Sequence, residues 1–316
     1  MLRPIGCATL LALVSCLPPG SSPASSTASA PPVSSRASAP SASSTASAPP
    51  PAISTVLVGA GDIAFCESDR DEATAALVDA IAGTVFTLGD NAYPDGGTDA
   101  FAQCYDPSWG RFAGRTRPSA GNHEYETADA SAYFAYFGAA AGVAGAGWYS
   151  YDIGAWHVIV LNSNCDAVGG CQAGSAQADW LAADLAAHPA ECTLAYWHHP
   201  RWSSGQHGSD DQTDGLWRLL AEAGADLVLT AHDHLYERFV PMDANGVAAP
   251  QGMVEFVVGT GGRSLYEFHD ILPTSAVHDN QTYGVLILTL RPGAYDWEFL
   301  PVLPADFTDV GSADCH

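Results

Sequence analysis

The chain has 316 residues and a formal net charge of −24 at pH 7; all eleven basic residues are arginine, and no acidic residue precedes Asp62. Only two arginines precede residue 53, so the remainder sets nine arginines against 35 carboxylates, a net charge of −26. This charge argues against nucleic-acid binding through phosphate contacts, which needs a basic face, and 47% hydrophobic residues exclude a chain that is disordered throughout.

The first sixteen residues have the pattern of an export signal. A positive start at Arg3 precedes an apolar stretch over residues 5–14, about half of the roughly 20 residues that a membrane-spanning helix needs. Cys16 directly follows Leu-Val-Ser, which resembles the lipobox of bacterial lipoproteins and implies a lipid anchor on that cysteine. Simple secretion is the alternative, and the anchor at Cys16 is the one membrane attachment that we expect.

Residues 17–52 consist almost wholly of Ser, Ala, Pro and Thr and contain no aromatic or acidic residue. Such a segment cannot bury enough apolar surface to offset the entropy of ordering, so we expect a disordered linker. The predicted organisation is a signal segment over 1–16, a linker over 17–52 and one folded domain over 53–316.

Six cysteines lie beyond the linker, and an even number suits three disulfides formed in an oxidising compartment. Fifteen pairings of six cysteines are possible. We expect Cys165–Cys171 because two glycines between them permit a tight loop, and the pairs Cys66–Cys104 and Cys192–Cys315 then follow. A thiolate metal site would need closer spacing such as C-x-x-C, which the sequence does not contain.

Apolar patterning predicts alternating strands and helices early in the domain and mainly strands late in it. The predicted strands are 53–59, 84–88, two within 147–162 that turn at Gly154, 193–197, 226–230, 253–259 and two within 283–301. The predicted helices are 68–82, 175–188 and 214–224. This order predicts an α/β fold in which two mixed β-sheets pack face to face, flanked by helices.

Five short polar clusters each follow an extended run. They are Gly61-Asp62, Gly89-Asp90-Asn-Ala-Tyr93, Gly121-Asn122-His123-Glu124, His198-His199-Pro200 and Ala231-His232-Asp-His234. Alone, each has an ordinary explanation, such as a turn, a helix cap or a buried histidine pair. Ligands of α/β sheets bind beyond the carboxyl ends of the strands, so five clusters in this order predict that these side chains converge on a metal site.

The ordered set resembles the calcineurin-like metallophosphoesterase superfamily and, within it, the purple acid phosphatases. The family pattern is D-x-G, G-D-x-x-Y, G-N-H-[DE], a His after an apolar strand, and G-H-x-H, and it is matched over about residues 56–238. Two positions depart from it: Ala64 replaces a Gly, or the His of D-x-H relatives, and Ala231 replaces a Gly. Both replacements are small, and the resemblance implies a metallophosphatase-type sandwich, with 53–316 as the metallophosphoesterase catalytic domain.

The resemblance also implies two metal ions and a ligand set. Metal one would take Asp62, Asp90, Tyr93 and His234, and metal two would take Asp90, Asn122, His198 and His232, with Asp90 bridging. Because Ala64 cannot ligate, Tyr93 is expected to fill the coordination there, although it is alternatively only a packed aromatic. A phenolate suits Fe(III), so iron is implied at site one, and zinc, manganese or iron at site two.

The implied activity is that of an exported phosphoesterase, foremost an acid phosphatase-like phosphomonoesterase acting on small phosphate esters. In the implied mechanism a metal-activated hydroxide attacks phosphorus in line with the leaving group. Asp90 and His123 are the predicted catalytic residues, with His123 near the leaving oxygen and oriented by Glu124 or Asp233. The alternatives are a phosphodiesterase acting on nucleotides or lipid headgroups, and a surface binding module without turnover.

Four further side chains are weaker candidates for substrate contact. His207 lies in a Ser/Gly-rich loop that can cover the site. His199 adjoins a predicted ligand but is expected to point to the opposite face of its strand. Arg201 and Arg238 lie near the predicted site and can pair either with phosphate or with surface carboxylates.

Overall fold

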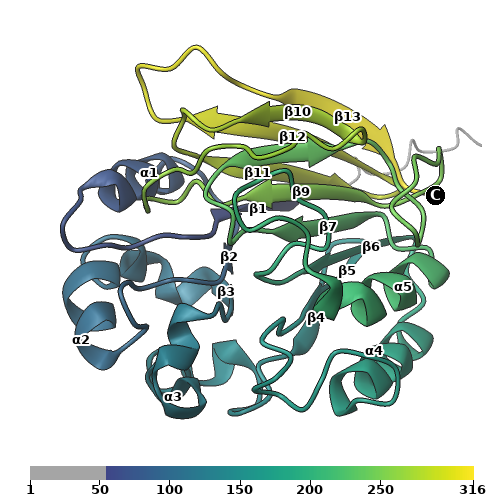
Figure 1. Ribbon diagram of the computed structural model, residues 1–316, viewed down its shortest axis with the longest axis horizontal. Helices are drawn as coiled ribbons and strands as arrows, with labels where there is room; N and C mark the ends of the chain where they lie inside the picture. The colour runs from purple at the N-terminus through teal and green to yellow at the C-terminus, as the bar shows by residue number, and fades with distance from the viewer. Residues whose placement is uncertain (1–54) are drawn as a thin grey trace, which may run out of the picture. The chain divides into compact units, whose positions relative to one another are not determined.

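The computed structural model describes residues 55–316 (Figure 1). The predicted signal segment, the anchor position Cys16 and the linker over 17–52 lie outside the described residues. From residue 55 onward, no helix combines the length and the apolar character needed to cross a membrane.

Two mixed β-sheets form the domain, as predicted. The first has six strands in the order β13-β12-β11-β1-β2-β3 and the second has seven in the order β10-β8-β9-β7-β6-β5-β4. The first sheet contains β1 (Thr55–Ala60), β2 (Thr84–Leu88), β3 (Thr116–Ser119), β11 (Gly284–Arg291), β12 (Ala294–Pro301) and β13 (Val310–Asp314). The second contains β4 (Tyr149–Ile153), β5 (Trp156–Val160), β6 (Cys192–Tyr196), β7 (Leu227–Thr230), β8 (Tyr236–Phe239), β9 (Val254–Val258) and β10 (Ser275–Asp279).

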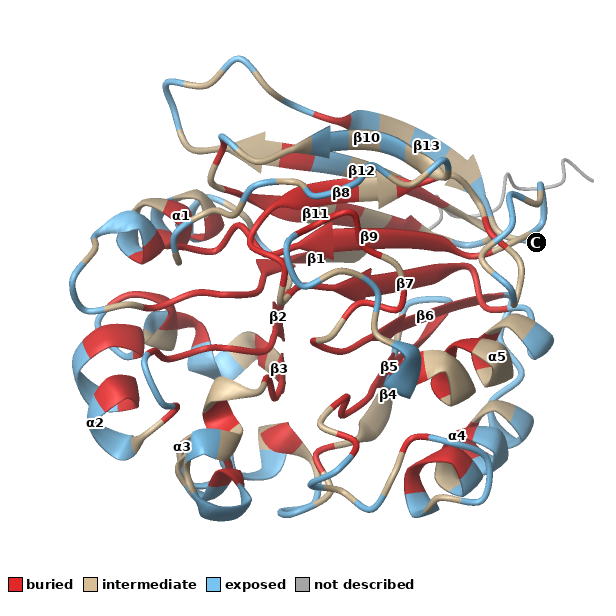
Figure 2. Cartoon of the chain, in the orientation of Figure 1, coloured by how far each residue is buried: buried red, intermediate tan, exposed pale blue. Residues whose placement is uncertain are grey.

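Parallel pairing joins β1, β2 and β3 in one sheet and β5, β6, β7 and β9 in the other, and the five polar clusters follow β1, β2, β3, β6 and β7. Most of these strands are nearly continuous apolar runs because both of their faces are covered, and Figure 2 shows most of them buried; β3, with the sequence Thr-Arg-Pro-Ser, is the exception. The edge strands β10 and β13 instead alternate between exposed and half-buried residues.

Aromatic contacts join the inner faces of the two sheets. The ring of Phe86 in β2 lies 6.0 Å from that of Tyr196 in β6, and Tyr236 in β8 lies 4.5 Å from Phe299 in β12. A second apolar cluster lies between the outer face of the seven-stranded sheet and two helices, α4 (Ala176–Ala187) and α5 (Asp214–Glu222). The helices therefore flank the sandwich, as Figure 1 shows.

The remaining helical segments mostly follow β1, β2 and β3. They are α1 (Arg70–Asp79), α2 (Thr98–Ala100), a π turn over Phe101–Tyr105, α3 (Ser131–Phe137) and 3₁₀ turns over Trp109–Arg115, His123–Glu126, Ala128–Ala130, Gly138–Ala141 and Asp211–Thr213. Our predictions contained α1, α4 and α5 but missed α2, α3 and the short turns between residues 98 and 141. They also missed β8, β10 and β13 as strands and contained β3 only as a short extended run before Gly121.

All three predicted disulfides are present: Cys66–Cys104, Cys165–Cys171 and Cys192–Cys315. The first ties the loop after β1 to the π turn, and the last ties the start of β6 to the end of the chain. Three such bonds are typical of proteins that fold in an oxidising compartment.

Candidate metal centre

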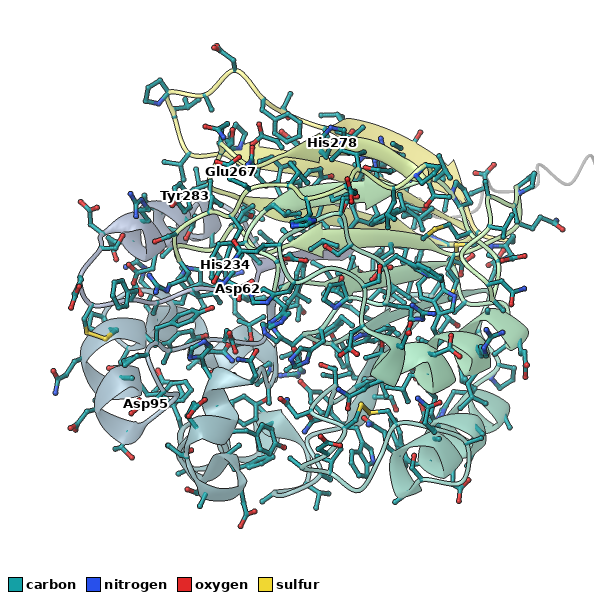
Figure 3. All side chains as sticks on the ribbon, in the orientation of Figure 1. Asp62, Asp95, His234, Glu267, His278 and Tyr283 are labelled. Atoms are coloured by element: carbon teal, nitrogen blue, oxygen red, sulfur yellow. A yellow bond between two sulfur atoms is a disulfide. The ribbon has the colours of Figure 1, made fainter. Side chains whose placement is uncertain are left out.

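Seven side chains from five loops meet where the parallel strands of both sheets end. We call this group the candidate centre; its members are Asp62, Asp90, Tyr93, Asn122, His198, His232 and His234. Asp62 follows β1, and His234 lies just beyond β7; Figure 3 shows these two side chains next to each other. The loops meet because the carboxyl ends of parallel strands share one edge of a sheet.

Three of these side chains point into the candidate centre from strained backbone positions. Asp62, Asp90 and His232 have positive φ angles of 57°, 48° and 67°, a conformation that non-glycine residues seldom adopt. Gly121 gives Asp90 its room, because a Cβ atom at residue 121 would lie 2.2 Å from Asp90 Oδ1. Such strain persists only where surrounding structure holds it, and it clusters at functional sites.

The first half of the candidate centre surrounds the hydroxyl of Tyr93. This oxygen lies 2.9 Å from Asp62 Oδ1, 3.0 Å from Asp90 Oδ2 and 3.1 Å from His234 Nε2. His234 Nε2 lies 3.4 Å from Asp62 Oδ1. Four potential ligand atoms of one predicted site thus face a common point.

The second half surrounds His198 Nε2. That nitrogen lies 3.4 Å from Asp90 Oδ2, 3.1 Å from Asn122 Oδ1 and 3.2 Å from His232 Nδ1. Asp90 Oδ2 therefore contacts both halves, as a carboxylate shared between two cations must. All seven side chains that the sequence places at the site are brought together.

Backbone carbonyls fix the two histidine rings from behind. His198 Nδ1 lies 2.7 Å from the Leu88 carbonyl, and His234 Nδ1 lies 2.7 Å from the Ser264 carbonyl. A carbonyl accepts only, so Nδ1 carries a proton and donates it, and Nε2 is the ring atom that faces the candidate centre. Metal-binding histidines have this arrangement.

The buried carboxylates of the candidate centre favour a bound cation. Asp62 and Asp90 are buried, and no ion pair within residues 55–316 brings an arginine to either carboxylate. Burial raises the pKa of Asp90, but the facing His198 ring outweighs this and holds that pKa well below its usual range. Burial lowers the pKa of His198, yet Asp90 raises it to about 9 overall. The donor set of carboxylates, imidazoles, amide and phenol fits metal ions, which would replace the proton on His198.

Burial and the charges of Asp62 and Asp90 raise the pKa of Tyr93 well above its usual value. The hydroxyl therefore stays protonated when it faces two carboxylates alone. A strongly charged cation at this position would favour the phenolate instead. The environment thus makes Tyr93 a ligand only for an ion that can displace its proton.

His123 lies beside the candidate centre. Its backbone N–H donates to Asp90 Oδ1 at 2.9 Å, its Nδ1 contacts the Pro94 carbonyl, and its Nε2 lies 3.7 Å from Asp90 Oδ2. About a third of the side chain is exposed, 32% of its area. The ring is thus positioned at the site and open to a bound molecule.

Neither predicted partner orients His123, and this expectation is wrong. The buried Glu124 carboxylate accepts backbone N–H groups of Asp90, Asn91 and Gly121 at 3.0, 2.8 and 2.6 Å. It therefore ties together the loops after β2 and β3 instead of touching the histidine ring. Burial and the nearby Asp90 raise the pKa of Glu124 to about 7, against the effect of two of these N–H groups.

Asp233 holds a different segment, the loop over residues 203–208. Its carboxylate accepts the Ser203 hydroxyl at 2.5 Å and the backbone N–H groups of His207 and Gly208 at 2.8 and 3.1 Å. The His207 ring consequently lies 4.3 Å from that of His232. The Ser/Gly-rich loop does reach the candidate centre, as predicted for His207.

His199 lies on the same side as His198, contrary to expectation. Its ring centre is 4.4 Å from that of His232, and its Nδ1 contacts the Ser163 hydroxyl at 2.8 Å. The alternation of a strand does not apply because β6 ends at Tyr196. Burial and the neighbouring His198 lower the pKa of His199 to about 3, so this ring is neutral.

Carboxylates pair with Arg201 and Arg238, for which the sequence left phosphate and surface carboxylates as alternative partners. Arg201 pairs with Asp211 at 3.0 Å and with Asp214 at 3.2 Å, and Arg238 pairs with Asp309 at 2.6 Å. These contacts favour the alternative that both arginines are structural.

Sequence reasoning missed two side chains at the site. The ring of Tyr266 stacks on that of His234 at 3.8 Å and 14°, and the guanidinium of Arg263 lies 5.2 Å from the centre of the Tyr93 ring. Both follow β9, which is parallel to β7 and ends at the same edge. The sequence signal for them is the group of polar residues that directly follows the Gly-Thr-Gly-Gly segment at 259–262.

The family model described as calcineurin-like phosphoesterase matches residues 56–236. That span covers more than half of the chain and all seven residues of the candidate centre. The chain belongs to the calcineurin-like phosphoesterase family. This membership agrees with the resemblance stated from the motifs, and the sandwich of two mixed sheets agrees with the predicted fold class.

Within the family, the chain resembles the purple acid phosphatases. It is 31% identical over 146 residues to purple acid phosphatase 18 of Arabidopsis thaliana, covering 43% of this chain and 32% of that protein. It is 29% identical over 182 residues to purple acid phosphatase 15 of the same plant, covering 51% and 33%. The chain thus spans about a third of the length of the curated relatives it matches.

Solved structures support the fold. Purple acid phosphatase PPD1 from yellow lupin (Lupinus luteus) seeds superposes with a TM-score of 0.67 at 19% identity, over 83% of this chain and 54% of that one. GAP50, described as the anchor in the inner membrane complex of Plasmodium, superposes with a TM-score of 0.64 at 15% identity, over 81% and 88%. At these identities the likeness extends to the fold and not to activity.

Proposed function

We propose that this chain is an exported dinuclear-metal phosphoesterase of the purple acid phosphatase type, and that it acts foremost on phosphomonoesters. The observation that carries the proposal is the convergence of seven potential ligands in two groups that share Asp90. Membership of the calcineurin-like phosphoesterase family supports it. The exported state is supported by the signal-like residues 1–16 and by the three disulfides.

The two groups of side chains would each hold one ion. Asp62, Asp90, Tyr93 and His234 would hold iron, and Asp90, Asn122, His198 and His232 would hold zinc, manganese or a second iron. When bound, such a pair supplies a hydroxide nucleophile near neutral pH and Lewis acidity toward phosphate oxygens. Asn122 adds a neutral oxygen, so it leaves more of the second ion's charge for substrate than a third carboxylate would.

The protein's own groups would handle the leaving oxygen. With Nδ1 of His123 held by the Pro94 carbonyl, Nε2 is the ring atom that faces Asp90 and the site. A protonated His123 can therefore donate from Nε2 to the departing alkoxide. The His207 ring, 4.3 Å from that of His232, and the Arg263 guanidinium, 5.2 Å from the centre of the Tyr93 ring, are the further groups that would contact the remaining phosphate oxygens.

Hydrolysis of an aryl phosphate compared with a bis-aryl phosphate tests the proposal. For the iron- and zinc-loaded protein, a phosphomonoesterase should favour the monoester in kcat/KM. The reverse preference would establish the phosphodiesterase alternative. If the metal-loaded protein hydrolyses neither compound, the enzymatic proposal is refuted. The remaining alternative is then a surface binding module without turnover.

Replacing His123 by alanine is expected to slow hydrolysis of alkyl phosphates about 10²–10⁴-fold, the usual contribution of a positioned general acid. Aryl phosphates with good leaving groups need less protonation, so their rates should fall much less. Initial rates over a series of leaving-group pKa values measure the difference. The exposed His278, replaced in the same way, is the control, and an equal loss across the series would contradict the acid role.

Replacing Tyr93 by phenylalanine is expected to abolish the visible phenolate-to-iron absorption and to lower the iron content of the purified protein. The reason is that Phe keeps the buried ring but removes the oxygen that faces Asp62, Asp90 and His234. Absorption spectra and elemental analysis of freshly purified wild type and variant provide the measurement. A wild-type protein that contains iron but has no such band would overturn the ligand role of Tyr93.

A further inference from the structure

A second group of histidine and aspartate side chains lies at the opposite end of β5. His157 is the second residue of that strand, whereas the candidate centre lies beyond the carboxyl ends of the strands. Asp152 comes from β4, and Asp184 and His188 come from the last turn and the end of α4. Figure 1 shows α4 beside these two strands.

The local sequence explains why these four side chains meet. Trp156, Val158 and Val160 point into the core between the sheets, so the alternation of β5 turns His157 toward the helices. Asp184 and His188 are four residues apart and share one face of α4. The β4–β5 hairpin pairs Asp152 with His157 in register.

His157 is buried and both of its ring nitrogens face carboxylates. Nδ1 lies 2.8 Å from Asp152 Oδ1, and Nε2 lies 2.8 Å from Asp184 Oδ2. The His188 ring stacks on that of His157 at 4.8 Å and 14°, and its Nδ1 lies 3.2 Å from Asp184 Oδ1. No ion pair within the described residues brings an arginine to either carboxylate.

A proton or a metal ion must lie between His157 Nε2 and the Asp184 carboxylate. If Asp152 accepts the Nδ1–H of His157, the Nε2 lone pair faces a carboxylate oxygen, and two acceptors at this distance repel each other. Either a proton between Nε2 and the carboxylate or a cation resolves the conflict. A carboxylate on the far nitrogen of a buried histidine is the arrangement that metal-binding histidines use.

We propose that His157 Nε2, the Asp184 carboxylate and His188 Nδ1 form a further metal site, for Zn²⁺ or a similar borderline divalent ion, with Asp152 as the positioning carboxylate. The structure brings one potential ligand atom from each of the three residues within 4.8 Å of the others. Imidazole and carboxylate are ligands of this class of ion, and water completes a tetrahedral set.

The site is reachable from solvent. A cavity of about 470 Å³ lies against Asp152, His157 and His188, and the His188 side chain is 46% exposed. Ion binding requires the half-exposed His188 ring to rotate, because its Nδ1 donates to the Asp184 carbonyl at 2.9 Å and its plane is nearly parallel to that of His157. A bound ion links the end of α4 to β5, so its effect is on stability and not on hydrolysis.

Zinc titration of the protein with its catalytic metals in place tests the site. Wild type should bind one more equivalent of Zn²⁺ by calorimetry and elemental analysis than His188→Ala or Asp184→Asn. Its Tm should rise by about 5 °C at a hundredfold excess of zinc over Kd, through preferential binding to the folded state. The variant His278→Ala, an exposed histidine on β10, should behave like wild type.

Equal zinc stoichiometry in wild type and His188→Ala would overturn the proposal, and a proton rather than a metal ion would then lie between His157 and Asp184. An equal zinc-dependent rise of Tm in both proteins would overturn it as well. Because His188 is half exposed, its replacement should fold, so the result does not depend on the more buried Asp184. Aryl phosphate hydrolysis by His188→Ala should match wild type, which separates this site from the proposed function.

Discussion

Replacing Asp90 by asparagine should reduce kcat for aryl phosphate hydrolysis by about 10³-fold or more and leave the protein short of one or both metal ions. Asp90 Oδ2 lies 3.0 Å from Tyr93 Oη and 3.4 Å from His198 Nε2, so this oxygen is common to both halves of the candidate centre. An amide keeps the shape of the side chain but loses the negative charge that two cations would share. The substitution therefore removes electrostatic attraction more than geometry.

Asparagine is a suitable replacement because the backbone at residue 90 is left-handed, with φ of 48°. Asn tolerates that conformation better than most residues, and its Oδ1 can still accept the N–H of His123. Metal content, circular dichroism and steady-state rates should be measured together. The exposed Asp99 in the same segment, changed to Asn, is the matched control. Two metal equivalents and a kcat within tenfold of wild type in Asp90→Asn would contradict a bridging Asp90.

The strands that carry the candidate centre could be predicted from sequence because they are buried on both faces. Continuous apolar runs such as 84–88 and 226–230 end abruptly in glycine or in polar residues, and β2 begins and ends where it was predicted. The edge strands β10 and β13 have no such signal. Their residues alternate between exposed and half-buried, and pairing with β8 and β12 holds them in place. Their strand conformation thus depends on tertiary context.

The short helical turns between residues 98 and 141 were missed for a related reason. They are three to seven residues long, too short for a helical period to appear in the sequence. Aromatic packing holds this region together, with Phe101 stacked on Tyr136 at 4.7 Å. The Cys66–Cys104 disulfide ties it to the loop after β1.

At the site, sequence reasoning found the side chains of the candidate centre but not the contacts behind them. The seven residues follow strands whose order fixes where they meet. The role of Glu124 could not be deduced from its motif. The same sequence is compatible with a carboxylate that accepts backbone N–H groups and with one that orients the neighbouring histidine ring. Tyr266 and Arg263 were missed because they come from a loop that the family motifs do not include.

Replacing Glu124 by alanine should lower the free energy of unfolding by about 3 kcal/mol or more. The substitution removes a buried carboxylate and leaves three buried N–H donors without their acceptor. Two of the donors, Asp90 and Asn91, lie after β2, and the third, Gly121, lies after β3. Without this link the loop of Asp90 and the loop of Asn122 lose their common support. We therefore expect kcat/KM to fall about 10²-fold even in the fraction that stays folded, because misplaced reacting groups have effects of this size.

Glu126 provides the matched control, because it is exposed and lies two residues after Glu124. Changed to alanine, it should leave Tm and kcat/KM near the wild-type values, whereas Glu124→Ala should lower Tm by about 10 °C. Glu124→Gln keeps the size of the side chain but offers one acceptor oxygen in place of two, so its losses should be intermediate. If Glu124→Ala lowers kcat/KM without any change in Tm, the carboxylate acts on substrate or on His123 rather than as the link between the two loops.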